Sequence, residues 1–237
     1  HRRGRGPASP LVGAAGREDG PSRIDRLMVH VPHLFVPGPW VDDRLQVSDQ
    51  QRRHLERVLR IDPGEEVGYT DGMGSFGSGR YHAAGVIRGE EGRVPRPTDL
   101  IVVCAPPDSR ERARFLVEKL AELGVAALRF LDTRHGHGRP PKVDRLRSWA
   151  VAGLEQSRGA WLMETFDGLV TFADIADPYV VCDMGGSSQR PSARTVVIGP
   201  EGGWAPGEIP EAVARFSLGD TVLRVETAAL VAAARMV

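Results

Sequence analysis

Two segments near the C-terminal end combine residue types that could build a small-molecule site. In residues 196–204, a β-branched run stops at Gly-Pro and continues through two more glycines. This pattern predicts a buried strand that ends in a loop whose main chain can approach a ligand closely, because glycine lacks a side chain. In residues 218–230, an apolar stretch runs through Arg224 and Glu226 into a helix expected over residues 227–237. We expect two strand-to-helix turns at one end of a sheet, where open α/β sheets usually bind small ligands.

The residues upstream alternate between strand-like and helix-like patterns, which is typical of a parallel sheet covered by helices. We expect helix 109–123 to be capped by Asp108 with Glu111 and to end at Gly124. Its buried stripe is expected at Leu116, Leu120 and Leu123. The other expected elements are strands 100–105, 127–131, 179–182 and 195–198 and helix 143–157. An α/β domain over residues 98–237 is therefore predicted.

Residues 28–97 are predicted to form a separate, β-rich domain with one short helix. Ser48 and Gln51 have the spacing of a capping box at the start of that helix. The apolar positions that follow at helical spacing are Leu55, Val58 and Leu59. Residues 89–98 contain two prolines and are expected to link the two domains. Residues 1–27 are rich in Arg, Gly and Pro, so we expect a flexible leader, with a basic RNA-binding tail as the alternative.

A glycine-rich stretch within the first domain invites a second interpretation. Expected strands at 66–70 and 81–87 flank residues 71–79, which favour a hairpin loop. Residues 72–77 also match GxGxxG, the dinucleotide fingerprint. That fingerprint requires a helix directly after the glycines, whereas an alternating strand pattern follows here. Dinucleotide binding is therefore disfavoured.

Composition restricts the partners and the compartment. The 31 Lys and Arg residues balance the 31 Asp and Glu residues, so an RNA partner would have to be bound by a local basic patch. Cys104 and Cys182 lie in apolar, strand-like runs and not in a CxxC pair, so we expect buried reduced thiols and a cytoplasmic protein. No apolar run is long enough to cross a bilayer, and no secretory signal pattern is recognisable, so neither membrane insertion nor secretion is expected.

Several motifs occur in the order found in ribosomal small subunit methyltransferase E, which the sequence resembles. They are EKLAELGV at 118–125, EQSR at 155–158, GPEGG at 199–203, LG at 218–219 and LRVETA at 223–228. HLERVLR at 54–60 and DG at 71–72 resemble the N-terminal domain of the same family. The resemblance covers essentially everything after Met28, and GPEGG together with LRxETA is its most specific part.

The resemblance implies an S-adenosylmethionine-dependent RNA methyltransferase of the SPOUT superfamily. Its fold would be a trefoil-knotted parallel-sheet α/β domain preceded by a small PUA-like β-barrel that helps to bind RNA. Its reaction would be methylation of N3 of a uridine in small-subunit (16S) ribosomal RNA, so its partner would be that RNA or the small ribosomal subunit, and the enzyme would act as a homodimer. Rules of chain topology alone would argue against a knot.

The two glycine-rich segments suit this methyl donor. S-adenosylmethionine carries no phosphate, so it needs main-chain amides and carbonyls and an apolar wall instead of a phosphate loop. The alternative is that the glycines only form tight turns. The residues expected to bind the cofactor are Gly199, Pro200, Glu201, Gly202, Gly203, Leu218, Gly219, Leu223, Arg224, Glu226, Thr227 and Ala228. Within this set, Arg224 and Glu226 are expected to form an internal ion pair that shapes the loop.

Methyl transfer to uridine N3 requires alignment, a route for the imide proton, and donors for the charge that develops on the carbonyl oxygens. Arg134 matches an arginine of the family, and we predict that it contacts the uracil or a phosphate. Glu201 is predicted to accept the proton or to orient the cofactor. The chain departs from the family at three places: His135 replaces a usual serine and precedes a glycine-rich stretch at 136–141, Val225 replaces a usual threonine, and Gly153-Leu154 replaces an alanine pair. The uridine side is more affected than the cofactor side.

The strongest candidate for an RNA-binding segment is residues 129–147, which contain six basic residues and only two aspartates. The residues expected to bind RNA are Arg139 and Lys142 here, and Arg52, Arg53, Arg57 and Arg60 on the short helix, where a solvated helix face is an equal alternative. His135 and His137 have no third ligand at a useful spacing, so no metal is expected and a mobile loop is favoured. Lys119 is expected on a helix surface or a dimer interface. Two alternative functions are a SPOUT enzyme with another RNA target and a non-catalytic RNA-binding or ribosome assembly protein.

Overall fold

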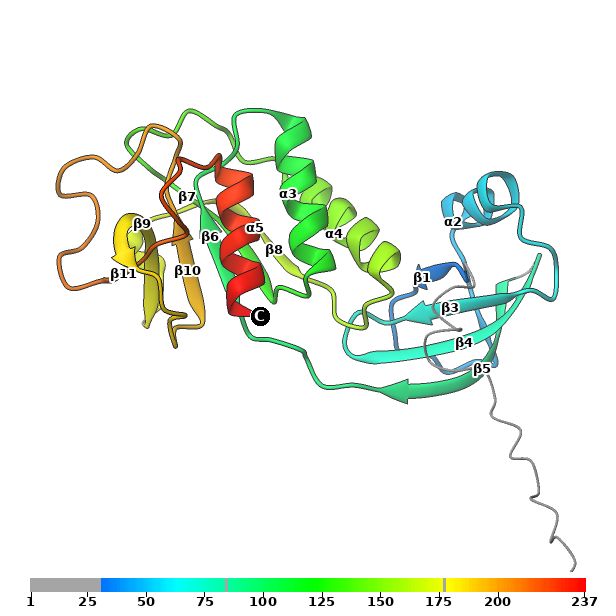
Figure 1. Ribbon diagram of the computed structural model, residues 1–237. Helices are drawn as coiled ribbons and strands as arrows, with labels where there is room; N and C mark the ends of the chain where they lie inside the picture. Colours follow the sequence, from blue (N-terminus) through cyan, green and yellow to red (C-terminus); the bar gives the residue numbers. More distant parts are fainter. Residues whose placement is uncertain (1–30, 84, 177) are drawn as a thin grey trace, which may run out of the picture. The chain divides into compact units, whose positions relative to one another are not determined.

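The computed structural model describes residues 31–83, 85–176 and 178–237 (Figure 1). The leader predicted at residues 1–27, and residues 28–30 of the predicted first domain, lie outside the described residues. Residues Pro32–Val237 form one compact unit that contains two sheets. The domain boundary predicted at residue 97 falls between the last strand of the first sheet and the first strand of the second in sequence. It remains a prediction.

The first sheet has five strands in the order β1-β3-β4-β5-β2. They are β1 (His33–Phe35), β2 (Arg44–Leu45), β3 (Glu66–Thr70), β4 (Ser75–His82) and β5 (Gly85–Arg93). Only the β1–β3 pair is parallel among the pairings of this sheet. The core beside this sheet includes Leu34, Leu45, Val67, Tyr69, Tyr81 and Val86 of the strands and Leu55 of the segment between β2 and β3.

The predicted hairpin at residues 71–79 was wrong in its extent, because β4 already begins at Ser75. The expected strand 81–87 also spans the turn between β4 and β5 instead of lying in one strand. Glycine has a packing role here: a Cβ on Gly77 would lie 2.7 Å from the Tyr69 ring, and one on Gly79 would lie 2.2 Å from the carbonyl oxygen of Ile87. Glycines in a strand that make room for a close neighbour are easily mistaken for loop residues when only the sequence is known. The strand after the GxGxxG motif is confirmed.

The short helix begins as predicted. In α2 (Asp49–Arg53), the Ser48 side chain accepts a hydrogen bond from the Gln51 amide, and the Gln51 side chain bonds back to Ser48. The helix continues as the π-helical η1 (His54–Leu59) and ends at a left-handed Arg60. The predicted apolar stripe is confirmed only in part: Leu55 is fully buried and Leu59 half-buried, whereas Val58 is 65% exposed.

The second sheet confirms the predicted parallel α/β class. Its six strands lie in the order β11-β9-β10-β6-β7-β8, and all five neighbouring pairs are parallel. The strands are β6 (Ile101–Cys104), β7 (Ala127–Leu131), β8 (Glu164–Val170), β9 (Tyr179–Ser187), β10 (Thr195–Ile198) and β11 (Ala214–Phe216). The two strands that the sequence did not predict, β8 and β11, are the two edge strands. Their residues are mostly exposed or half-buried, so they lack the continuous apolar run of a central strand.

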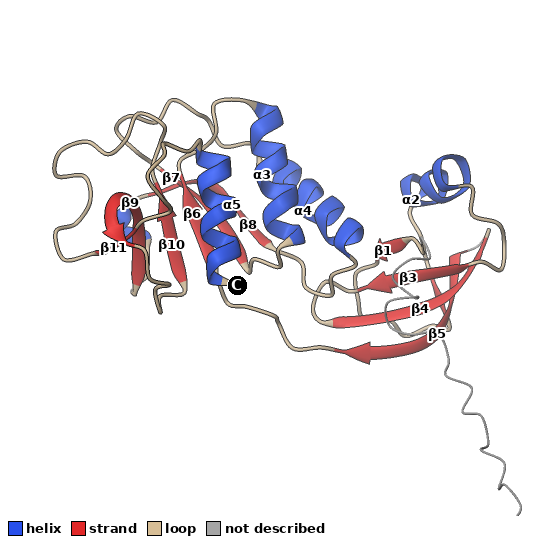
Figure 2. Cartoon of the chain, in the orientation of Figure 1, coloured by secondary structure: helices blue, strands red, loops and turns tan. Residues whose placement is uncertain are grey.

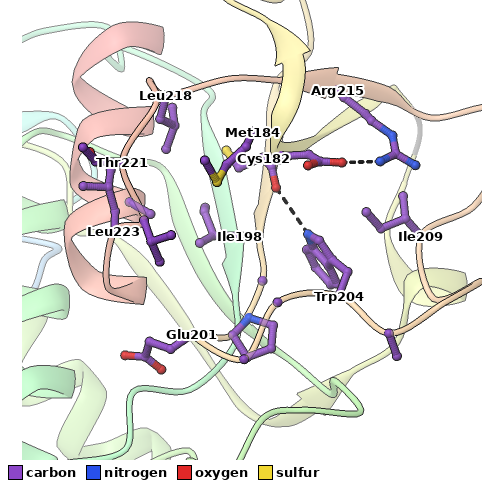
Figure 3. Close-up of a pocket in the computed structure, with 18 of the residues that line it drawn as sticks. Cys182, Met184, Ile198, Glu201, Trp204, Ile209, Arg215, Leu218, Thr221 and Leu223 are labelled. Carbon is purple, nitrogen blue, oxygen red and sulfur yellow. Dashed lines mark hydrogen bonds and ion pairs between the residues drawn. The ribbon is translucent and has the colours of Figure 1, made fainter.

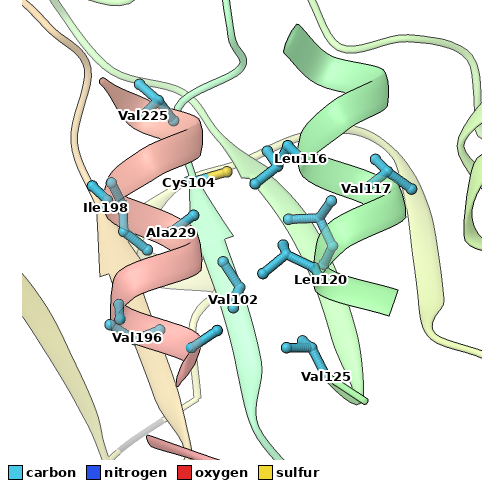
Figure 4. Close-up of a cluster of buried hydrophobic side chains, with 14 of the residues drawn as sticks. Val102, Cys104, Leu116, Val117, Leu120, Val125, Val196, Ile198, Val225 and Ala229 are labelled. Carbon is cyan, nitrogen blue, oxygen red and sulfur yellow. The ribbon is translucent and has the colours of Figure 1, made fainter. Parts of the chain in front are cut away.

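Three helices cover one face of this sheet: α3 (Arg110–Glu122), α4 (Val143–Ser157) and α5 (Val225–Met236) (Figure 2). Val102 and Cys104 of β6 lie between α3 and α5, where they pack with Leu120 and Ala229 (Figure 4). The opposite face carries a smaller cluster around Val103, Leu131, Val181 and Val197, with Phe172 of the short 3-10 helix η2 (Phe172–Asp174) against it. No helix in the described part of the chain is long and apolar enough to span a membrane.

The ends of α3 correct two predictions. The N-cap is Ser109, whose side chain accepts from the Arg112 amide at 3.2 Å, and not Asp108 with Glu111. Gly124 does end the helix, with a φ of 76°. The Gly124 amide bonds to the carbonyl of Ala121 and the Val125 amide bonds to that of Leu120, which is a Schellman motif. This reversal buries Val125 against the predicted Leu116 and Leu120 stripe and leaves Leu123 36% exposed.

Candidate functional site

A cavity of about 610 Å³ lies at the carboxyl end of β10 (Figure 3). Its walls come from residues 182–184 of β9, from the loop that follows β10, and from the loop that precedes α5. Nine of the predicted cofactor-binding residues line it: Gly199, Pro200, Glu201, Gly202, Gly203, Leu218, Gly219, Leu223 and Ala228. Arg224, Glu226 and Thr227 do not line this cavity. The two glycine-rich segments are thus brought together at one end of a parallel sheet.

The first segment is not a strand-to-helix turn, which corrects the predicted local structure, whereas the second segment does connect a strand, β11, to the helix α5. After β10 the chain forms an irregular loop over residues 199–213 and then enters β11. Three prolines and four glycines in that loop prevent a helix. The stretch before α5 is a loop over residues 217–224, and α5 begins at Val225, two residues earlier than expected.

Glycine is required at particular points of the cavity wall. Gly203 and Gly219 have φ values of 73° and 134°, which side-chain-bearing residues rarely adopt. A Cβ on Gly199 would lie 2.6 Å from Cε2 of Trp204, so glycine lets that indole pack against the main chain. At these points the wall is main chain without side chains, and at Gly199 an aromatic ring packs closely against it.

Of the apolar wall, the sequence predicted Leu218 and Leu223 but not Ile198, Trp204 or Ile209. Trp204 is fixed by a hydrogen bond from its Nε1 to the carbonyl of Cys182 (3.3 Å) and by Phe172, whose ring centre lies 5.6 Å away. Leu218, Thr221 and Leu223 lie on the other side of the cavity from Trp204 and Ile209, and Ile198 lies between them (Figure 3). Trp204 directly follows the GPEGG motif, so its position in the sequence was a usable signal.

The β9 residues at the cavity offered no local signal. Cys182 and Met184 line it, and Asp183 forms an ion pair with Arg215 of β11 beside it. Burial raises the pKa of the Cys182 thiol to about 12, so this sulfur is protonated and is a poor nucleophile at neutral pH. Cys104 is also a free thiol whose pKa is raised by burial. The predicted reduced thiols are confirmed, although Cys182 is only half-buried.

A second cavity, of about 600 Å³, adjoins the first and shares Pro200, Glu201 and Gly202 with it. Its other lining residues come from the loop before α3 and the start of that helix, from the loop after β7, and from the loop before α5: Pro106, Asp108, Arg112, Arg134, His135, Gly136, His137, Gly138 and Arg224. The structure therefore brings Arg134 and Glu201, the two predicted catalytic residues, to one cavity.

Arg112 is the centre of the charges at the second cavity. Its Nη1 is 2.8 Å from Oδ1 of Asp108 and 3.7 Å from Oε1 of Glu201, and its Nε is 3.7 Å from Oε1 of Glu226. The predicted ion pair between Arg224 and Glu226 is wrong, because Glu226 in the first turn of α5 pairs with Arg112 of α3 instead. The Glu226 side chain is only 9% exposed, and its Oε2 has no hydrogen-bond partner within the described residues. This network was missed because it joins segments that are far apart in sequence.

The segment after β7 is attached to the loop after β10. The main-chain amide of Arg134 donates to Oε1 of Glu208 at 2.8 Å, and its Nη1 donates to the carbonyl of Pro206 at 3.4 Å. Nδ1 of His135 lies 3.1 Å from the carbonyl oxygen of Gly203. The Arg134 side chain remains exposed at the second cavity and can reach a ligand there.

The predicted RNA-binding residues lie outside both cavities. Those that are exposed are Arg53, Arg57, Arg60, Arg139 and Lys142. Arg52 is half-buried, and its Nε is buried without a partner among the described atoms, so it is less suited to phosphate contact. Lys119 pairs with Glu122 at 2.8 Å on α3. Within residues 31–83, 85–176 and 178–237, no group of three or more His, Cys, Asp or Glu residues could hold a metal ion.

The chain also matches known proteins in sequence and in fold. The sequence profile of the RNA methyltransferase domain matches residues 94–237, which is more than half of the chain. The chain belongs to the RNA methyltransferase domain family. The matched residues contain the whole six-stranded sheet and both cavities of this RNA methyltransferase domain.

Individual relatives confirm the resemblance noted in the sequence. Ribosomal RNA small subunit methyltransferase E of Synechocystis is 26% identical over 232 residues, covering 86% of this chain and 76% of that protein. A probable rRNA-methyltransferase from Porphyromonas gingivalis is 29% identical, with a TM-score of 0.74, covering 86% of this chain and 96% of that one. Ribosomal RNA small subunit methyltransferase E from Neisseria gonorrhoeae, solved bound to S-adenosyl methionine, is 23% identical with the same TM-score and coverage, and so shares the fold.

Proposed function

We propose that this chain transfers the methyl group of S-adenosylmethionine to N3 of a uridine in small-subunit ribosomal RNA. The observation that carries the proposal is the pair of adjoining cavities, which share Pro200, Glu201 and Gly202. One cavity offers glycine main chain and apolar walls, and the other offers arginines. A methyl donor and a nucleobase bound in adjoining cavities would meet at the shared residues.

The residues of the first cavity fit S-adenosylmethionine. Its volume of about 610 Å³ lies within the range of roughly 300–1,000 Å³ that small-molecule sites occupy. Main chain at Gly199, Gly203 and Gly219 can bond to the adenine and ribose, and Trp204 with Ile198 supplies an apolar wall for the ring system. Relatives solved with this molecule, from Neisseria gonorrhoeae and Legionella pneumophila, share the fold at 23% identity.

When bound, S-adenosylmethionine supplies an electrophilic methyl group on a sulfonium. The chain's own task is to align the uracil N3 with that group and to remove the imide proton. Glu201 borders both cavities with a side chain that is 39% exposed, so its carboxylate can accept that proton or orient the donor. Arg134 can donate two hydrogen bonds to a uracil carbonyl or a phosphate as negative charge develops there.

The finer features of the family belong to the same proposal. They are the trefoil knot in the six-stranded sheet, the PUA-like character of the first sheet as an RNA-binding barrel, the homodimer and a cytoplasmic location. RNA contact is assigned to Arg53, Arg57, Arg60, Arg139 and Lys142, whose exposed guanidinium and ammonium groups can neutralise phosphates.

The proposal is tested by mass mapping of ribosomal RNA from a strain that lacks the gene, with the purified chain added back. Loss of one N3-methyluridine in the small-subunit RNA, restored by the wild-type chain, is the expected result. An Arg134→Ala variant should restore little methylation while keeping its calorimetric affinity for S-adenosylmethionine. A missing methyl group on another base would point to a different RNA target, and no binding of S-adenosylmethionine would point to a non-catalytic RNA-binding protein.

A further inference from the structure

One carboxylate holds the main chain of both loops that form the two cavities. Oε2 of Glu208 accepts a hydrogen bond from the Ala205 amide at 2.7 Å, and Oε1 accepts one from the Arg134 amide at 2.8 Å. The Glu208 amide in turn donates to the carbonyl of Ala205 at 3.1 Å, which closes a tight turn. Glu208 itself lines neither cavity. It therefore acts on groups that line them, and not on a ligand.

Further contacts near Glu208 also connect the loop after β7 with the loop after β10. The Arg134 side chain donates to the carbonyl of Pro206, and His135 bonds to the carbonyl of Gly203. His135 also packs against Gly202, where an added Cβ would lie 3.1 Å from the Cβ of His135. Ala205, Pro206 and the glycines belong to the first cavity, whereas Arg134 and His135 belong to the second.

We propose that Glu208 is a positioning residue that fixes Arg134 relative to the methyl-donor loop and thereby couples binding in the two cavities. The inference rests on the proposed function for the identity of the two ligands. A ligand that orders residues 199–207 also orders the Ala205 end of the Glu208 bridge, and the other end holds the main chain of Arg134. The second ligand then meets a loop that is already ordered, which is positive coupling between the sites.

The chain offers a sharp variant and a matched control. Glu208→Gln keeps the size of the side chain, but its amide has only one acceptor oxygen, so one of the two main-chain bonds is lost. Glu208→Asp keeps the charge but shortens the side chain, so it cannot span both amides, and it serves if the glutamine variant fails to fold. Glu211→Gln removes the same charge from an exposed glutamate three residues further on.

The decisive measurement is the affinity for a small-subunit ribosomal RNA fragment with and without saturating S-adenosylhomocysteine. We expect the ligand to tighten RNA binding at least about fivefold in the wild type and in Glu211→Gln, and less than about twofold in Glu208→Gln. Coupling that persists in both Glu208 variants, or a wild type that binds both ligands independently, overturns the inference but leaves the proposed function standing. A wild type that binds no S-adenosylhomocysteine refutes both.

A double-mutant cycle separates positioning from a purely structural role. If Glu208 acts through Arg134, Glu208→Gln should lower kcat by about tenfold or more in the wild type and by less than about twofold in an Arg134→Ala background. A structural role would give the same loss in both backgrounds and would weaken the binding of each ligand alone. Equal losses therefore refute the assignment.

Discussion

A single methyl group at Gly199 should disable the first cavity without unfolding the protein. In Gly199→Ala, the new Cβ would lie 2.6 Å from Cε2 and 2.8 Å from Cζ2 of Trp204. Carbon atoms pack at about 3.5–4.0 Å, so the indole ring must retreat by about 1 Å. Its hydrogen bond to the carbonyl of Cys182 and its packing against Phe172 oppose that movement.

The cost follows from the overpacking of a closely packed site, which is about 1–3 kcal/mol. If the ring keeps its place, the cost appears as lost stability, and the melting temperature falls by about 2–4 °C for each kcal/mol in a chain of this size. If the ring moves into the cavity, the cost appears in the affinity for S-adenosylmethionine, which should fall by roughly 5- to 150-fold at 1.4 kcal/mol per factor of ten. Together the two losses should account for the whole penalty.

Calorimetry with S-adenosylmethionine and thermal unfolding measure the two parts. Gly203→Ala is the contrasting variant, because its Cβ would meet nothing within 4 Å and its penalty comes only from a φ of 73°. Trp204→Leu in the Gly199→Ala background should regain part of the affinity, since it removes the ring that clashes. Wild-type affinity together with an unchanged melting temperature in Gly199→Ala would refute this view of the cavity wall.

Three further predictions concern charge. Arg112→Met should lower the free energy of unfolding in urea by about 1–3 kcal/mol, which is less than the roughly 3–5 kcal/mol of a fully buried pair because Arg112 is 30% exposed. Adding Glu226→Gln should recover part of the loss, because it removes the carboxylate that is left without its partner. Burial lowers the pKa of His33 to about 4, with a smaller contribution from the charge of Arg158 and against the effect of a hydrogen bond to Gly159. Roughly 3 kcal/mol of folding stability is therefore present above pH 6.5 and is lost as the pH falls to 4. Melting curves of His33→Gln should lack that loss. Arg139→Ala should make the plot of the logarithm of the RNA association constant against the logarithm of the salt concentration less steep by about one. An unchanged slope would show that Arg139 does not contact the RNA.

Much of the fold could be predicted because the central strands and the helices carry strong local patterns. The bounds expected for β3, β7, β10 and α4 match the structure at both ends. The edge strands β8 and β11 were missed because a strand with one neighbour and partial exposure shows little apolar periodicity. The cap of α3 was assigned one residue too early, since both Asp108 and Ser109 are good N-cap residues and only the structure distinguishes them.

In the candidate site, too, local features could be predicted and long-range contacts could not. The glycine loop could be predicted because its signal is local and lies in consecutive residues. Arg112 and Glu208 could not, because their roles arise from contacts across long separations in sequence: Glu208 lies 74 residues from Arg134. The expected partner of Glu226 was wrong for the same reason, since a residue two positions away was a plausible neighbour and the true partner is on another helix.

The two cavities differ in how directly a substitution changes them. The first cavity combines five glycines with apolar side chains, and the hydrogen-bonding groups of the glycine main chain persist when neighbouring side chains change. The second cavity has more charged side chains, among them Asp108, Arg112 and Arg134, so substitutions of these residues change its charge directly. His135 stands at the junction, since it lines the second cavity while bonding to the main chain of Gly203 at the first. On the proposed assignment of the two cavities, a substitution at His135 therefore changes the cavity assigned to RNA while the first cavity keeps most of its lining.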